Sequence, residues 1–151
     1  MRDDSALLFG DWYMTLDGII SAKLEEMDKV LHELSGLGKL TLSQLQDNWQ
    51  TKRAVERDLQ ILVEIVIDIC QRILSLRDYQ VAPTSSEAIQ QCQDLGIIEP
   101  NQNYRIMVQF RNFVVHRYES VDDAILCDIV NNHLDDIKRF RREVREYVEN
   151  N

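Results

Sequence analysis

An apolar run between Thr41 and Leu76 constrains the fold more than any other feature of the chain. Its hydrophobic residues recur at helical spacing but occupy most of the helix circumference: Val55, Leu59, Leu62, Val63, Val66, Ile69 and Ile73. A helix of this kind is buried on nearly all sides, so we expect it at the centre of a bundle. Its one polar stripe is narrow: Arg53, Arg57, Gln60, Glu64 and Asp68.

The rest of the chain is typical of further helices. Glycine and proline are scarce, with 5 and 2 among 151 residues, and none of the apolar patterning requires a strand. We expect helices over residues 17–33, 41–76, 84–95 and 101–116, and from Ser120 to the C-terminus, with capping at Thr41 or Ser43 and at Thr84. The sequence predicts a single all-α domain over residues 1–151, a four- to five-helix up-and-down bundle.

Composition excludes several classes of protein. Charged residues make up 28% and hydrophobic residues 44% of the chain, which disfavours disorder. Acidic residues interrupt the longest apolar stretches, so we expect no segment that spans a membrane. The N-terminus, Met1-Arg2-Asp3-Asp4, lacks the basic and then apolar pattern of a signal peptide. These features favour a cytoplasmic protein.

The cysteines and histidines suggest neither disulfides nor a metal centre. Cys70, Cys92 and Cys127 are odd in number, scattered, and form no CxxC pair. None of the three histidines has a cysteine or a second histidine at ligand spacing, so we expect no zinc site and no cofactor.

The net charge of −9 argues against a protein that coats nucleic acid nonspecifically. The acidity is uneven, however. Residues 101–151 contain 8 basic and 9 acidic residues, a net charge of −1, so most of the negative charge lies in residues 1–100. A nucleic-acid site in the C-terminal third is compatible with this distribution.

The segment from Arg111 to Tyr118 carries the strongest functional signal. It reads Arg-Asn-Phe-Val-Val-His-Arg-Tyr and ends an apolar helical run. On a helical wheel, Ile106, Met107, Phe110, Phe113 and Val114 form the expected core face. Arg105, Gln109, Asn112 and His116 form a polar stripe. Arginine binds phosphate and histidine exchanges protons near neutral pH, which are two requirements of RNA cleavage without a metal ion.

A plainer interpretation is also available for these residues. A histidine near the C-terminus of a helix often only compensates the helix dipole. Arg111 can be a surface residue that covers the apolar edge, and Tyr118 an aromatic side chain packed at a helix end.

The spacing Arg-x4-His-x-Tyr resembles the signature of the HEPN superfamily (higher eukaryotes and prokaryotes nucleotide-binding domain), and specifically its HepT-type toxins. Asn112 also matches the family's preference for a polar residue after the arginine. The resemblance covers most of the chain in architecture, but only these eight residues with sharp specificity.

The resemblance implies a metal-independent endoribonuclease with a composite site across a homodimer. It implies that His116 acts as general acid/base, that Arg111 binds the scissile phosphate and that Asn112 orients the pair, with a 2′,3′-cyclic phosphate product. The expected substrate is cellular RNA, either transfer RNA or messenger RNA. It further implies a minimal nucleotidyltransferase antitoxin that adds AMP to Tyr118 and so blocks the phosphate site.

Four further arginines are weaker candidates for contact with RNA: Arg105, Arg117, Arg141 and Arg142. Basic residues near a helix C-terminus also compensate the dipole or pair with acidic neighbours, so this signal is less specific. Two other functions stay open: a noncatalytic HEPN-like module that binds a nucleotide or assists a nucleotidyltransferase, and a purely structural helical interaction protein.

Overall fold

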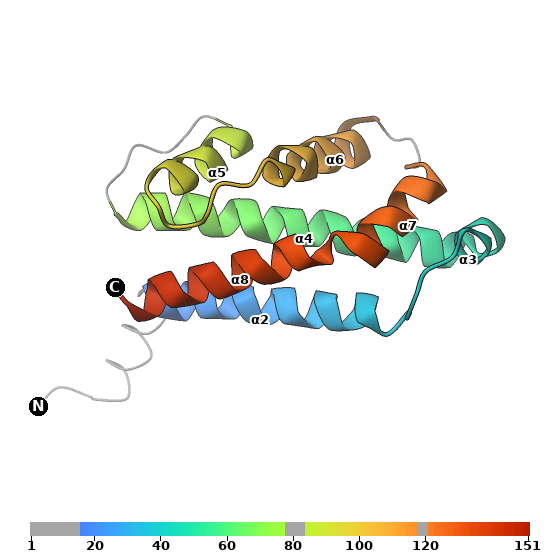
Figure 1. Cartoon of the computed structure of the whole chain (residues 1–151), viewed down its shortest axis with the longest axis horizontal. Coiled ribbons are helices and arrows are strands. Elements are labelled where there is room, and N and C mark those ends of the chain that lie inside the picture. Colours follow the sequence, from blue (N-terminus) through green and yellow to red (C-terminus); the bar gives the residue numbers. More distant parts are fainter. Residues whose placement is uncertain (1–15, 78–83, 118–120) are drawn as a thin grey trace, which may run out of the picture.

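A long central helix, α4 (Trp49–Leu76), organises the computed structural model (Figure 1). The structure describes residues 16–77, 84–117 and 121–151. Every other helix in these ranges packs against α4. All seven apolar residues that predicted a central position for this segment are buried. The all-round hydrophobicity of the run therefore has the expected cause, which is that α4 has neighbours on most of its sides.

The other helices surround α4 as an up-and-down bundle. In chain order the helices are α2 (Leu16–Ser35), α3 (Leu42–Asp47), α4, α5 (Ser85–Asp94), α6 (Asn103–Arg117), α7 (Asp123–Asn132) and α8 (Leu134–Glu149). Figure 1 shows α2 and α8 along one side of α4, and α5 and α6 along the other. The described residues contain no strand, and the predicted all-α bundle is confirmed.

Two segments that we expected as single helices are each divided in two. The first breaks at Asn48, whose Oδ1 accepts hydrogen bonds of 3.1 Å from the backbone N–H groups of Gln50 and Thr51. Asparagine competes in this way for backbone donors, so it ends one helix and caps the next. The second breaks at His133, between α7 and α8. α7 is capped by Asp122, while the expected start at Ser120 lies outside the described residues.

The predicted caps at Thr41 and Thr84 are confirmed. Thr41 Oγ1 accepts from the N–H of Gln44 at 3.3 Å, and Gln44 Oε1 accepts from the N–H of Thr41 at 2.8 Å. Thr84 Oγ1 accepts from the N–H of Glu87 at 3.1 Å and begins α5. These short polar signals locate helix starts well because each satisfies backbone donors that a helix leaves unpaired.

Polar side chains fix the start of α6 against α8. The Nδ2 atoms of Asn101 and Asn103 each donate a 2.9 Å hydrogen bond to the carboxylate of Asp136. An ion pair of 2.6 Å between Lys52 and Asp123 joins α4 to the start of α7. The helix that carries the candidate motif is therefore held at its N-terminal end by α8, and α7, which follows the motif, is held by α4.

No helix in the described ranges combines the length and the apolar character needed to cross a lipid bilayer.

Candidate functional site

The polar stripe expected on α6 is present. Arg105, Gln109, Asn112 and His116 are all exposed along one side of the helix. The prediction that His116 projects to solvent, and not into the core, is confirmed. A solvent-facing histidine in the last turn is accessible to a substrate.

The apolar side of α6 differs from the expectation. Ile106, placed on the expected core face, is 57% exposed, whereas Tyr104 and Val108 are buried. Met107 and Phe110 are only partly buried. Tyr104 is buried because its ring packs against Phe140 of α8, and Val108 lines the cavity between α5 and α6. Helical periodicity alone does not reveal which of two apolar sides a short neighbouring helix covers.

Arg111 lies on the covered side and is half-buried. Its Nη2 donates a hydrogen bond of 2.8 Å to Ser85 Oγ, at the first residue of α5. Its Nε is buried and has no hydrogen-bond partner among the described residues. The guanidinium is thus held in place at one end and has a buried donor without a protein partner among the described residues.

Asn112 and His116 project from the exposed stripe, away from Arg111. Five residues of α-helix turn the direction of a side chain by about 140°, so Arg111 and His116 lie on different sides of α6. The structure therefore brings Asn112 and His116 together, four residues apart, and places Arg111 at the α5–α6 contact.

Part of the predicted site lies outside the described residues. Tyr118, the candidate for modification, belongs to residues 118–120, which the structure does not describe. Arg117 is the last residue of α6, and its side chain also lies outside what is described.

The other candidate RNA-binding arginines have different surroundings. Arg105 is exposed and lines a cavity between α5 and α6. Arg142 is exposed on α8. Arg141 forms a two-pronged ion pair with Asp28 of α2, with distances of 2.5 Å from Nε and 2.8 Å from Nη2. This pairing raises the pKa of Arg141, and it gives that side chain a structural role between α2 and α8.

Ser85, which contacts the motif, carried no signal in the sequence. Ser85 follows the Thr84 cap, and only the fold brings it to Arg111, 26 residues later. Arg139 belongs to the basic run Lys138-Arg139-Phe140-Arg141-Arg142 of α8, which the sequence makes a candidate for RNA contact, and its side chain lines the cavity near Tyr104. Contacts across a bundle leave no periodic trace in a single sequence.

The buried cysteines behave as small core residues. Cys70 and Cys92 are free and buried, and Cys92 Sγ donates to the Cys70 carbonyl at 3.7 Å. The hydrogen bond with Cys92 and burial raise the pKa of the Cys70 thiol, which keeps it protonated and unreactive. Within the described ranges, no group of three or more His, Cys, Asp or Glu side chains is placed to hold a metal ion.

Two nucleases resemble this chain in sequence. It is 24% identical over 132 residues to the tRNA nuclease HepT of Aphanizomenon flos-aquae, which covers 86% of this chain and 90% of that protein. It is 28% identical over 100 residues to the mRNA nuclease HepT of Shewanella oneidensis, which covers 65% of this chain and 75% of that protein.

Solved structures resemble the fold as a whole. The tri-AMPylated HEPN toxin of Shewanella oneidensis, in complex with MNT antitoxin, superposes with a TM-score of 0.77 at 22% identity, over 85% of this chain and 97% of that one. A toxin–antitoxin structure with AMP-PNP gives a TM-score of 0.71 at 22% identity, over 87% of this chain and 98% of that one.

A sequence model described as "Ribonuclease HepT-like" matches residues 22–144, a range that contains α6 and its motif. The chain therefore belongs to the ribonuclease HepT-like family.

Proposed function

We propose that this protein is an endoribonuclease toxin that cleaves cellular RNA without a metal ion, through Arg111, Asn112 and His116. The carrying observation is that the Arg-x4-His-x-Tyr segment ends α6 within the family match, with His116 and Asn112 exposed on one stripe. Relatives named as a tRNA nuclease and an mRNA nuclease support RNA as the substrate, and either kind fits.

The chemistry follows from the side chains. His116 removes the proton of the ribose 2′-hydroxyl or protonates the leaving oxygen, as general acid/base. Arg111 binds the scissile phosphate and stabilises the charge that develops on it, and Asn112 orients the reacting groups. Because the ribose supplies the nucleophile, the product is a 2′,3′-cyclic phosphate, and DNA is not a substrate.

We also propose a homodimer whose interface includes the uncovered side of α6. Ile106, Met107 and Phe110 line an apolar groove of about 280 Å³ together with Ile125 and Ile129 of α7. Ile106 is 57% exposed and Ile125 is 52% exposed, so the groove contains large aliphatic side chains in contact with water. A second copy of the chain would cover them.

The dimer is also consistent with the positions of the catalytic candidates. The apolar groove and the motif share α6, and the groove residue Phe110 precedes His116 by about 9 Å along the helix axis. A site assembled from both copies provides exposed Asn112 and His116 side chains to the same RNA strand.

The proposed partner is an MNT antitoxin that neutralises the toxin by adding AMP to Tyr118. The structurally similar toxin is described as tri-AMPylated and in complex with MNT antitoxin, which supports this form of control. Tyr118 follows Arg111 by seven residues, so a bulky anionic nucleotide there would compete with RNA for the arginine.

Growth and cleavage assays test the proposal. The unsubstituted chain should arrest growth on expression and cleave RNA in vitro, and folded His116→Ala should do neither. Coexpression with the antitoxin should add about 329 Da per AMP to the mass of the protein and abolish cleavage, and Tyr118→Phe should prevent the addition. A chain that binds nucleotide but never cleaves RNA would instead be a noncatalytic module.

A further inference from the structure

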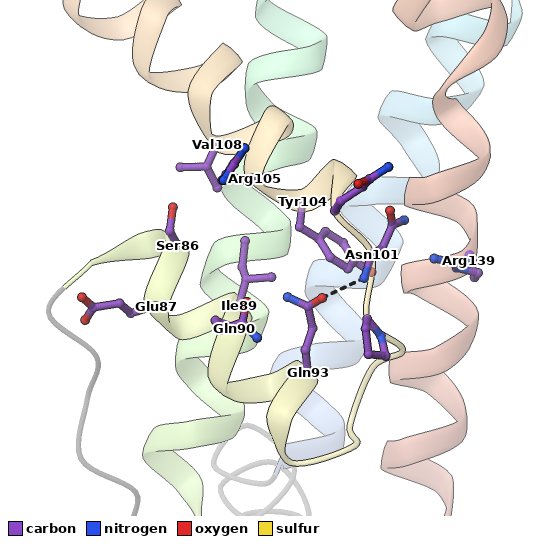
Figure 2. A pocket seen from close by; sticks show the side chains of 12 residues that line it. Ser86, Glu87, Ile89, Gln90, Gln93, Asn101, Tyr104, Arg105, Val108 and Arg139 are labelled. Atoms are coloured by element: carbon purple, nitrogen blue, oxygen red, sulfur yellow. Dashed lines mark hydrogen bonds between the residues drawn. The ribbon is translucent and has the colours of Figure 1, made fainter.

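A large cavity is lined by Arg105 of the motif helix α6 and not by the exposed His116. It has a volume of about 920 Å³ and lies between α5 and α6, with Arg139 reaching it from α8 (Figure 2). Figure 2 shows Ser86 and Ile89 of α5 pointing toward Val108 and Arg105 of α6. A cavity of this volume is large enough for a nucleotide.

Two residues that line this cavity each have a buried polar atom without a hydrogen-bond partner among the described residues: the Tyr104 hydroxyl and Arg139 Nε. Tyr104 is 2% exposed, and its ring packs edge-on against Phe140 at 6.1 Å. Burial, and then the charge of Glu143, raise the pKa of Tyr104 above its ordinary value, so the hydroxyl keeps its proton. Both atoms can therefore donate, and a bound group with acceptor oxygens would satisfy them.

The charge of the cavity is opposite to that of the whole chain. Arg105 and Arg139 line it, and Glu87 is the only carboxylate among its lining residues. The chain has a net charge of −9, so a local excess of positive charge favours an anionic ligand at this place. The amide side chains of Gln90 and Gln102 also line the cavity, and amides can pair with the edges of nucleobases.

The cavity lies next to the residue of α5 that holds Arg111. Tyr104, Val108 and Arg111 follow one another at helical spacing: the Tyr104 ring packs against Phe140 of α8, Val108 lines the cavity, and Arg111 donates to Ser85 of α5. Ser85, which holds Arg111, directly precedes the lining residue Ser86. Arg105 lies about 9 Å before Arg111 along the helix axis and is turned about 120° from it around α6, so a strand that contacts both residues must pass partly around the helix.

We infer that this cavity binds the part of the RNA strand next to the scissile phosphate, with Arg105 on a backbone phosphate and the amide side chains against a base. Arg139 and the Tyr104 hydroxyl would donate to oxygens of the same nucleotide. The inference rests on the proposed function, because the strand in the α5–α6 cavity is taken to be the same RNA whose scissile phosphate Arg111 binds.

Equilibrium binding and cleavage, measured on the same variants, test the inference. Fluorescence anisotropy with a single-stranded RNA oligomer would use the His116→Ala chain to prevent cleavage, and cleavage rates would use chains that retain His116. Arg105→Glu reverses a charge at the cavity, and Ser86→Trp fills the cavity without a charge change. Arg72→Glu is the matched control, because Arg72 is exposed on the α2 side of α4.

We expect Arg105→Glu and Ser86→Trp to weaken RNA binding about tenfold or more, and Arg72→Glu to change it less than about threefold. Arg105→Glu should also reduce the slope of log affinity against log salt concentration by about one. Equal affinities for Arg105→Glu and Arg72→Glu would overturn the inference and leave the nuclease proposal intact.

Two other outcomes separate the inference from the nuclease proposal. RNA that binds through Arg105 to a chain that never cleaves it would support the cavity and refute the nuclease. Tighter binding of free AMP or ATP than of the RNA oligomer, lost on Ser86→Trp, would identify a mononucleotide site and overturn the inference.

Discussion

Arg111 Nη2 donates a 2.8 Å hydrogen bond to Ser85 Oγ, which links the motif helix α6 to the first residue of α5. The contact directs the arginine toward α5 and away from the exposed His116 stripe. Ser85 of α5 therefore orients the arginine of the motif, although the motif itself lies on α6.

The first prediction concerns Ser85 as a positioning residue for Arg111. Ser85→Ala removes the acceptor, and we expect RNA cleavage to fall about tenfold, because a hydrogen bond to a charged group contributes about 1.5 kcal/mol or more. Ser85→Thr retains the hydroxyl and should restore most of the rate. An equal loss of activity in Ser85→Ala and Ser85→Thr would show that the Ser85 hydroxyl does not position Arg111.

The second prediction is that cleavage does not require a divalent metal ion. The proposed chemistry relies on proton transfer by His116 and on the charge of Arg111, so excess EDTA should leave the cleavage rate of the purified protein unchanged within about twofold. The products should carry 2′,3′-cyclic phosphate ends. Activity abolished by EDTA and restored by Mg²⁺ would contradict the proposed mechanism.

Sequence patterning predicted the scaffold well, because caps and periodicity are local. The central position of α4, the caps at Thr41 and Thr84 and the exposed stripe with His116 are confirmed. The break at Asn48 was missed, because its side chain caps a helix within a run whose apolar spacing continues across it.

Contacts between elements were not predictable from the sequence. Ile106 was expected in the core and is exposed, while Tyr104 is buried against Phe140 of α8, because the positions of the neighbouring helices decide which side of α6 is covered. The bond from Arg111 to Ser85 spans 26 residues and follows no motif. These contacts require the fold, since a single sequence records spacing along helices and not the neighbours of each helix.

The third prediction separates two adjacent arginines of α8. Arg141 pairs with Asp28 through two of its nitrogens, whereas Arg142 is exposed. Arg141→Ala should lower the free energy of unfolding by about 1 kcal/mol, allowing for solvent screening of a partly exposed pair, and lower Tm by about 3 °C. Arg142→Ala should leave both unchanged. Thermal melts of Arg141→Ala, Asp28→Ala and the double variant give the coupling between the two side chains. If the pair contributes nothing, the changes in unfolding free energy of the two single variants will add up to that of the double variant.

The fourth prediction concerns pH. Burial, and then the neighbouring Glu33, raise the pKa of Asp58 on α4 to about 6. The folded chain then binds this proton more tightly than the unfolded chain does. Its contribution to stability is complete below the ordinary aspartate pKa of about 4, and is lost as pH rises through about 6.

Asp58→Asn should remove this loss. We expect the variant to be more stable than the unsubstituted chain at pH 7.5, by about 2 °C in Tm, with a smaller difference at pH 4.5. Glu26→Gln, at an exposed position of α2, is the matched control and should keep the original profile. Identical pH profiles for Asp58→Asn and the unsubstituted chain would show that Asp58 titrates alike in both states.

The fifth prediction tests the proposed dimer through Ile106, which is 57% exposed on the apolar groove. Ile106→Glu places a charge at that surface, so the monomer should fold while dimerisation weakens about tenfold or more, because an unpaired carboxylate is costly to bury. Leu95→Glu is the matched control: Leu95 is also exposed, at the end of α5, and does not line the groove.

Sedimentation of both variants, together with the unsubstituted chain, gives the molecular mass over a range of concentrations. If Ile106→Glu is a monomer while Leu95→Glu and the unsubstituted chain are dimers, the interface on α6 is supported. The Ile106→Glu variant should then also lose RNA cleavage. Ile106 has an aliphatic side chain that takes no part in the proposed reaction, so a loss of cleavage in Ile106→Glu would reflect the missing second copy. A dimer that survives Ile106→Glu would place the interface elsewhere.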